Sequence, residues 1–209
     1  MYEDIFESIR IEAEKRNLKE STTDAYCNSV CYFLRTVNKD ISDLTTDDVD
    51  AFLFLGEGDF HPLAAAFGVQ KDVFVLNPVT REVRDMAETR DRILRKRFAA
   101  IQSAKNADSF LVIVCSKVGQ DRSSAADEVI EKIRTHGHKA YKAMLEEITP
   151  VSLMAYRVDA YVNTACPRVA MDDSARYDRP MLTIPELDIV LGEKEWADYT
   201  FDQIRPEQN

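Results

Sequence analysis

Four polar segments of this 209-residue chain combine residue types that can bind a charged ligand or a metal. Each follows an apolar run of strand length, and they are Gly56–His61, Asn77–Thr80, Ser116–Gln120 and Cys166–Arg168. In a parallel sheet, the loops that leave the carboxyl ends of the strands hold the functional groups. These segments are therefore the first candidates for a site.

The first segment has glycines two positions apart, Gly56 and Gly58, followed by the imidazole of His61. Glycines let a backbone approach a ligand closely. The third glycine of a dinucleotide-binding fingerprint and the Lys-Ser/Thr pair of a P-loop are both absent. The pattern is thus compatible with a ligand-binding loop and with a structural turn. His61 is interpreted either as a ligand contact or as a capping or core-edge histidine.

The segment after Cys115 places a cation, a glycine and an amide together, at Lys117, Gly119 and Gln120. A helix is expected to begin directly behind it, near Asp121–Ser124. An anionic group could bind the N-terminal amides of that helix, with Lys117 as its counter-charge. The alternative is a solvated turn.

Two cysteines follow predicted strands and are candidate metal ligands. Cys166 lies two residues before Arg168, and a thiol beside a cation at a strand end can act as a ligand or a nucleophile. Cys115 ends another strand, and in a 2-1-3 strand order the two strands are neighbours, so both thiols could face one crevice. The alternatives are a small core residue at Cys166 and simple burial at Cys115.

The apolar pattern predicts the scaffold for these segments. Residues 1–48 contain no Gly or Pro, and their helical spacing predicts an all-helical segment with helix starts near Ser21–Thr23 and Thr45–Thr46. After residue 48, strands alternate with helices, which indicates right-handed βαβ units and an α/β fold of Rossmann-like parallel sheets. The expected strands are Ala51–Leu55, Val73–Leu76, Phe110–Cys115, Ala140–Leu145 and Ala160–Ala165, and the expected helices are Arg84–Lys105, Ser123–Thr135 and Thr149–Tyr156.

Charge and hydropathy exclude several classes of protein. The chain has 27 basic and 37 acidic residues, and a net charge of −10 repels a phosphate backbone, so general nucleic-acid binding is disfavoured. The longest apolar runs, such as Leu63–Phe67, are too short to span a membrane. The acidic start, Met1–Glu7, lacks the pattern of a secretory signal. We therefore expect a cytoplasmic protein with reduced cysteines.

The basic residues gather at one place, the predicted helix Arg84–Lys105. We interpret this cluster as a solvated helix face, and the alternatives are a surface for an acidic partner or for nucleic acid. Its members are Arg90, Arg92, Arg95, Lys96 and Arg97.

Several motifs follow one another in a distinctive order between about Val49 and Ile204. They are Asp50–Leu63 (DAFLFLGEGDFHPL), Asn77-Pro78, Arg90-Asp91-Arg92, Lys117-x-Gly119-Gln120, Val158–Arg168 (VDAYVNTACPR), Asp172-Asp173 and Leu182–Leu187 (LTIPEL). In this order they resemble the diphthamide-synthesis proteins, specifically the last half of an archaeal 2-(3-amino-3-carboxypropyl)histidine synthase. The resemblance extends over roughly three quarters of the chain.

The resemblance implies a fold, a reaction and a set of site residues. Members of the family have three similar α/β domains, each of which gives one cysteine to a [4Fe-4S] cluster that binds S-adenosylmethionine. The implied reaction is the radical transfer of a 3-amino-3-carboxypropyl group to a histidine of translation elongation factor 2. Cys166 matches the cluster cysteine of the third domain, and recruitment of Cys115 would be an additional assumption. The residues that would hold the methionine part are His61, Lys117, Gly119, Gln120 and Arg168.

The resemblance also divides the chain. Residues 49–105 correspond to part of the second domain, residues 106–204 to the third domain, and residues 205–209 form a tail. Two of the three cluster cysteines of the family have no counterpart here, so whether the chain is an active enzyme stays open. Either a partner completes the site, in a homodimer or with a full-length synthase, or the chain is a non-catalytic subunit.

The first 48 residues resemble a different family, the helical core-binding domain of tyrosine recombinases, which grips DNA. The matching positions are Leu18–Thr22, Tyr26, Phe33-Leu34 and Ile41–Val49. The segment is acidic and no recombinase catalytic domain follows it. A DNA-binding fragment is kept as a third alternative.

Overall fold

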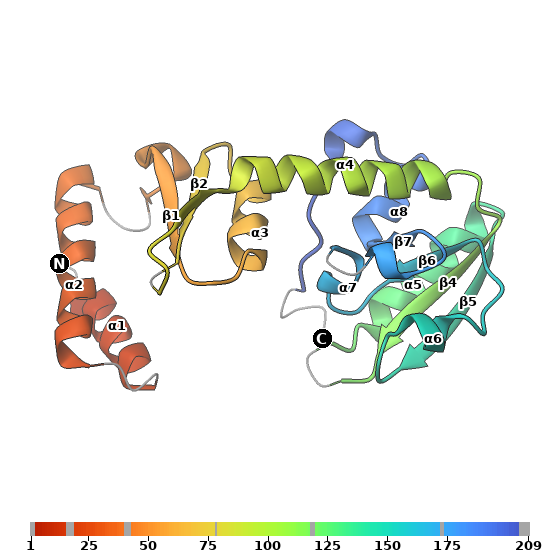
Figure 1. Cartoon of the computed structure of the whole chain (residues 1–209), viewed down its shortest axis with the longest axis horizontal. Helices are drawn as coiled ribbons and strands as arrows, with labels where there is room; N and C mark the ends of the chain where they lie inside the picture. The colour runs from red at the N-terminus through yellow and green to blue at the C-terminus, as the bar shows by residue number, and fades with distance from the viewer. Residues whose placement is uncertain are drawn as a thin grey trace. The chain divides into compact units, whose positions relative to one another are not determined.

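The computed structural model describes residues 3–15, 19–39, 43–77, 79–117, 120–171 and 174–204. Gly119, Asp172, Asp173 and the tail at 205–209 lie outside the described residues. The chain forms two compact units, residues 1–50 and 51–209 (Figure 1). The division falls where the sequence changes from a purely helical pattern to alternating strands and helices.

The first unit is helical in its described part, as predicted. It consists of α1 (Glu3–Lys15), α2 (Glu20–Val37) and the 3₁₀ turn η2 (Thr46–Asp48). The helix predicted to start near Ser21–Thr23 begins slightly earlier, at Glu20, so these residues lie in its first turn and do not cap it; the amides of Thr22 and Thr23 donate to the carbonyl of Lys19. The predicted helix start at Thr45–Thr46 is confirmed: the Thr45 hydroxyl accepts from the Asp47 amide at 3.2 Å, although the element that follows is a single 3₁₀ turn.

The second unit begins with a three-stranded sheet of order β1-β2-β3. The strand β1 (Ala51–Leu55) is parallel to β2 (Asp72–Leu76), and β3 (Val83–Asp85) is antiparallel to β2. Helices α3 (Phe60–Gly68) and α4 (Met86–Ala104) contribute Leu63, Ala66, Met86 and Ile93 to the core under this sheet. The predicted helix Arg84–Lys105 began too early, because β3 occupies its first residues and the Asp85 carboxylate caps α4 at the Ala87 amide, at 2.8 Å.

The second sheet is fully parallel and has the order β5-β4-β6-β7. Its strands are β4 (Ser109–Cys115), β5 (Lys139–Leu145), β6 (Ala160–Asn163) and β7 (Met181–Leu182). One core layer includes residues of α5 (Ser123–Thr135) and α8 (Ile184–Val190), and the other includes residues of α6 (Pro150–Leu153) and α7 (Arg168–Met171). The predicted α/β fold with a parallel sheet is confirmed, and so is the adjacency of the strands before Cys115 and Cys166.

Helix α4 is common to both halves of this unit (Figure 1). Its first half packs in the core of the first sheet through Ile93, and its second half packs in the core of the second sheet through Ile101. Between them Arg97 is buried, which corrects its assignment to a solvated face. Arg92, Arg95 and Lys96 are exposed as predicted. None of the described helices is both long enough and apolar enough to cross a lipid bilayer.

Candidate functional site

Phe60 connects two of the predicted site residues. The guanidinium carbon of Arg168 lies 5.3 Å from the centre of the Phe60 ring, and the His61 ring meets the same ring edge-on with centroids 5.7 Å apart. A guanidinium at this distance from an aromatic face is attracted by the negative potential of the ring. Because Phe60 begins α3 and Arg168 begins α7, the contact joins the segments that follow β1 and β6.

His61 lies at the exposed end of an aromatic stack. Its ring is parallel to that of Phe54 on β1, with centroids 6.4 Å apart and an angle of 3° between the planes. The side chains of His61 and Arg168 are both exposed, so a ligand can reach them. The stack orients the imidazole from the strand below it.

Cys166 occupies the turn between β6 and α7, and a buried amide fixes this turn. Asn163 donates from Nδ2 to the carbonyl of Cys166 at 3.0 Å and accepts from the Ala165 amide at 3.2 Å. The Val169 amide donates to the same Cys166 carbonyl at 3.1 Å. The thiol is half-buried and is a free cysteine. The role of Asn163 was not predicted, because this residue belongs to the motif around Cys166 but resembles an ordinary strand residue.

Cys115 ends β4 and is buried. Its Sγ lies 3.7 Å from the carbonyl of Glu146, which it contacts as a weak donor. These surroundings support the interpretation of Cys115 as a buried core residue. Throughout the part of the chain that the structure describes, no three His, Cys, Asp or Glu side chains gather as a metal site. A cubane cluster needs several thiolates, so the described residues of this chain do not hold one by themselves.

Two of the predicted residues after β4, Lys117 and Gln120, have contacts in the structure. The Gln120 amide donates to the Lys117 carbonyl at 3.0 Å, and the exposed Lys117 ammonium lies 3.9 Å from a Glu147 carboxylate oxygen. Asp121 accepts from the Ser123 amide at 2.9 Å, so a carboxylate of the chain already binds at the start of α5, where an anionic ligand was expected. Gly119, the third residue of this prediction, lies outside the described residues.

The two remaining polar segments form turns. The Gly56 amide donates to the Leu76 carbonyl at 3.1 Å, and a Cβ on Gly56 would lie 2.7 Å from the Phe54 ring, which favours the structural-turn interpretation. The Asn77 carboxamide oxygen accepts from the amides of Val79 and Thr80, at 2.9 and 3.2 Å. Asn77 therefore shapes the turn toward β3.

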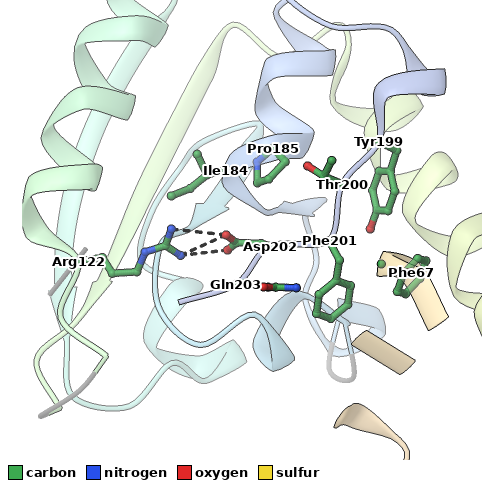
Figure 2. A pocket seen from close by; sticks show the side chains of 10 residues that line it. Phe67, Arg122, Ile184, Pro185, Tyr199, Thr200, Phe201, Asp202 and Gln203 are labelled. Atoms are coloured by element: carbon green, nitrogen blue, oxygen red, sulfur yellow. Dashed lines mark hydrogen bonds and ion pairs between the residues drawn. The ribbon is translucent and has the colours of Figure 1, made fainter. Parts of the chain in front are cut away.

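A polar cavity lies between the end of α3 and the residue before α5. It has a volume of about 490 Å³, and Arg122, Tyr199, Phe201 and Asp202 are among its lining residues (Figure 2). Arg122 donates from Nη1 to Asp202 at 3.0 Å, and both side chains are buried. Burial raises the pKa of Asp202 above its ordinary value, and the charge of Arg122 offsets only part of this effect. The predicted site residues that the structure describes do not line this cavity.

Known proteins resemble this chain in sequence and in structure. The family model described as a diphthamide synthesis protein matches residues 2–200. A Pyrococcus horikoshii protein named 2-(3-amino-3-carboxypropyl)histidine synthase is 36% identical over 155 residues, which are 74% of this chain and 44% of the relative. Subunit 1 of the same synthase from Yarrowia lipolytica is 32% identical over 170 residues, 77% of this chain and 38% of the relative.

A solved structure supports the same assignment. The crystal structure of Dph2 from Pyrococcus horikoshii with a 4Fe-4S cluster superimposes with a TM-score of 0.69 at 33% sequence identity. The match covers 79% of this chain and 46% of that chain, so the present chain spans less than half the length of the relatives it matches. On the strength of the family model and of the shared fold, this chain belongs to the diphthamide synthesis family.

Proposed function

We propose that this chain forms one part of a site that transfers a 3-amino-3-carboxypropyl group from S-adenosylmethionine to a histidine of translation elongation factor 2. One observation supports this proposal most: Arg168, after β6, and His61, after β1, both contact the ring of Phe60. Through this contact Cys166, Arg168 and His61 belong to one edge of the fold. The names of the relatives supply the product, a histidine that carries a 3-amino-3-carboxypropyl group.

The exposed polar groups at this edge suit an α-amino acid. Arg168 can bind a carboxylate through two parallel hydrogen bonds. Lys117 provides a second cation after β4, and Gln120 provides an amide that can donate or accept. We assign to these residues, with His61 and Gly119, the binding of the methionine part of S-adenosylmethionine. Cys166 is assigned as one thiolate ligand of a [4Fe-4S] cluster.

A partner chain must supply the other ligands, because one thiol does not hold a cluster. The partner is either a second copy of this chain or a full-length synthase. In the same proposal, residues 49–105 correspond to part of the second domain of the family and residues 106–204 to the third domain. The proposed location is the cytoplasm.

Complementation of a full-length synthase tests this proposal. The Pyrococcus horikoshii relative would be inactivated by replacing its third-domain cluster cysteine and mixed anaerobically with this chain, a reductant, S-adenosylmethionine and elongation factor 2. We expect this chain to restore the mass increase of the factor, and Cys166→Ala to fail. Equal restoration by wild type and Cys166→Ala, or none by either, would refute the assignment.

A non-catalytic subunit is the second candidate, and one face of the first sheet favours it. Leu53, Leu55 and Val83 are 58%, 56% and 63% exposed, and β1 is an edge strand in the described sheet. An exposed apolar face beside an open strand edge is typical of a surface that another chain covers. Stimulation of an intact synthase to the same extent by wild type and by Cys166→Ala, but not by Leu53→Lys, would identify this role.

The recombinase-like resemblance of residues 1–48 stays a prediction. The family model extends through this segment, from residue 2. A DNA-binding fragment would show a DNA affinity that falls steeply with salt, which a titration of duplex DNA at two salt concentrations measures.

A further inference from the structure

The segment Tyr199–Gln203, called the C-terminal segment below, packs against α3. The ring centroid of Phe201 lies 5.1 Å from that of Phe67 and 5.8 Å from that of Phe60. The rings of Phe201 and Phe67 are nearly parallel. Phe201 thereby joins the core of the first sheet although it lies far along the chain (Figure 2). It contacts the ring that also supports Arg168.

The next residue of the C-terminal segment is attached to the second sheet. Asp202 accepts two hydrogen bonds from Nη1 of Arg122, at 3.0 and 3.3 Å, and one from Nη2 at 3.4 Å. Arg122 precedes α5 directly and follows Gln120 by two residues. A buried pair with this geometry holds the start of α5, and with it the end of the segment that contains Lys117.

Both ends of the C-terminal segment are anchored. Before it, Trp196 packs edge-on against Phe98 of α4, with ring centroids 5.1 Å apart. Within it, the ring centroid of Tyr199 lies 4.9 Å from that of Trp196 and 6.0 Å from that of Phe67. Through these side-chain contacts the segment connects α4 with α3 and with the start of α5.

We propose that Phe201 and Asp202 are positioning residues that hold the segments after β1, β4 and β6 at the spacing the site requires. Neither residue touches the ligand: Phe201 acts through Phe60 on His61 and Arg168, and Asp202 acts through Arg122 on Lys117 and Gln120. The family model ends at residue 200, before both of them. The inference rests on the proposed function for its ligand, but the coupling between the segments is testable without it.

Amide hydrogen exchange of the whole chain tests the coupling. We expect Asp202→Asn to accelerate exchange at residues 120–124, and Phe201→Leu at residues 60–64 and 168–171, by about tenfold, while β4 stays protected. The conservative variants Asp202→Glu and Phe201→Tyr should restore most of the protection. Matched controls are Asp198→Asn, an exposed carboxylate nearby, and Tyr141→Leu, an exposed aromatic residue of β5. Unchanged exchange, or a uniform increase that includes β4, would overturn the proposal.

The affinity for S-adenosylmethionine tests whether Phe201 and Asp202 position the proposed ligand-binding residues. In the complex with the full-length relative, Asp202→Asn and Phe201→Leu should raise the Kd about tenfold without lowering iron content, and the conservative variants should recover it. An unchanged Kd would overturn the positioning role even if Arg168→Gln abolishes binding. If wild type binds no S-adenosylmethionine, the proposed function fails, and the exchange experiment alone decides the coupling.

Discussion

Arg97 of α4 and Glu186 of α8 form a two-point ion pair with side chains that are 1% and 0% exposed. Nε donates to Oε1 at 2.7 Å and Nη2 donates to Oε2 at 2.5 Å. Both side chains form further hydrogen bonds, since Arg97 Nη1 donates to the Ala170 carbonyl at 2.8 Å and Glu186 Oε2 accepts from the Thr183 amide at 2.8 Å. Burial alone would lower the pKa of Arg97, but the hydrogen bond and charge of Glu186 raise it. The Arg97 guanidinium is therefore charged in the folded chain.

Removal of one partner should destabilise the second unit strongly. Arg97→Met leaves the carboxylate of Glu186 buried without its counter-charge, and such losses cost about 3–5 kcal/mol. The matched control is Arg95→Met on the exposed face of the same helix, for which we expect a change within about 0.5 kcal/mol. Guanidinium unfolding of the three proteins measures both values.

The double variant Arg97→Met with Glu186→Leu provides a further check. It removes both charges together, so it should be more stable than Arg97→Met alone. Two results would contradict the assignment of a buried pair. One is an equal loss of unfolding free energy in Arg97→Met and Arg95→Met, and the other is a double variant that is less stable than Arg97→Met.

The stability of the chain should depend on pH through Asp202. Burial raises the pKa of this carboxyl from its ordinary value of 3.8, so the folded state retains a proton that the unfolded state has released. The unfolding free energy due to this group therefore falls as the pH rises from 3.8 through the raised pKa. Between these two pKa values the loss is about 1.4 kcal/mol for each pH unit. Asp202→Asn has no such dependence.

The measurement is the difference in unfolding free energy between wild type and Asp202→Asn in urea at several pH values. The contributions of most other titratable groups to the unfolding free energy cancel in this difference. We expect wild type to lose stability relative to the variant as the pH rises from about 4 and to level off once the carboxyl is ionised. A difference that grows with pH in favour of wild type would mean that Arg122 lowers the pKa of Asp202 overall.

Arg168 should contribute to binding of the methionine carboxylate. Hydrogen bonds to charged groups contribute roughly 1.5–3 kcal/mol, so Arg168→Gln should raise the Kd for S-adenosylmethionine about 10- to 100-fold in the complex with a full-length relative. Arg179→Gln is the matched control, because this arginine is also exposed and lies in the same half of the unit. Isothermal titration under anaerobic conditions gives both constants, and similar values for the two variants would argue against carboxylate binding by Arg168.

Elements with strong local patterns could be predicted from the sequence. Helix α5 has the predicted bounds, Ser123–Thr135, and strands β1 and β4 differ by at most one residue from the expected runs. Helix α3 was not predicted, because its sequence from Phe60 to Gly68 is short and apolar on nearly every side. The burial of Arg97 was not predictable from its basic neighbours, since its partner lies 89 residues away.

The candidate site could be predicted only in part. The rule that loops follow strand ends selected the segments with His61, Lys117 and Cys166, but it says nothing about contacts between them. Phe60 stood inside a selected segment, where an aromatic residue indicates core packing as readily as support for a cation. The role of Asp202 could not be predicted from the sequence, because its partner Arg122 is 80 residues earlier in the chain.

The proposed function depends above all on Cys166 providing a thiolate to a cluster shared with a partner chain. The decisive measurement is anaerobic reconstitution with iron and sulfide, using this chain mixed with a full-length relative whose third-domain cluster cysteine has been replaced. Visible absorbance and iron content should show a stable cluster with wild type and with Cys115→Ala, and no cluster with Cys166→Ala. A cluster that survives Cys166→Ala, or one that is lost with Cys115→Ala alone, would refute this role of Cys166.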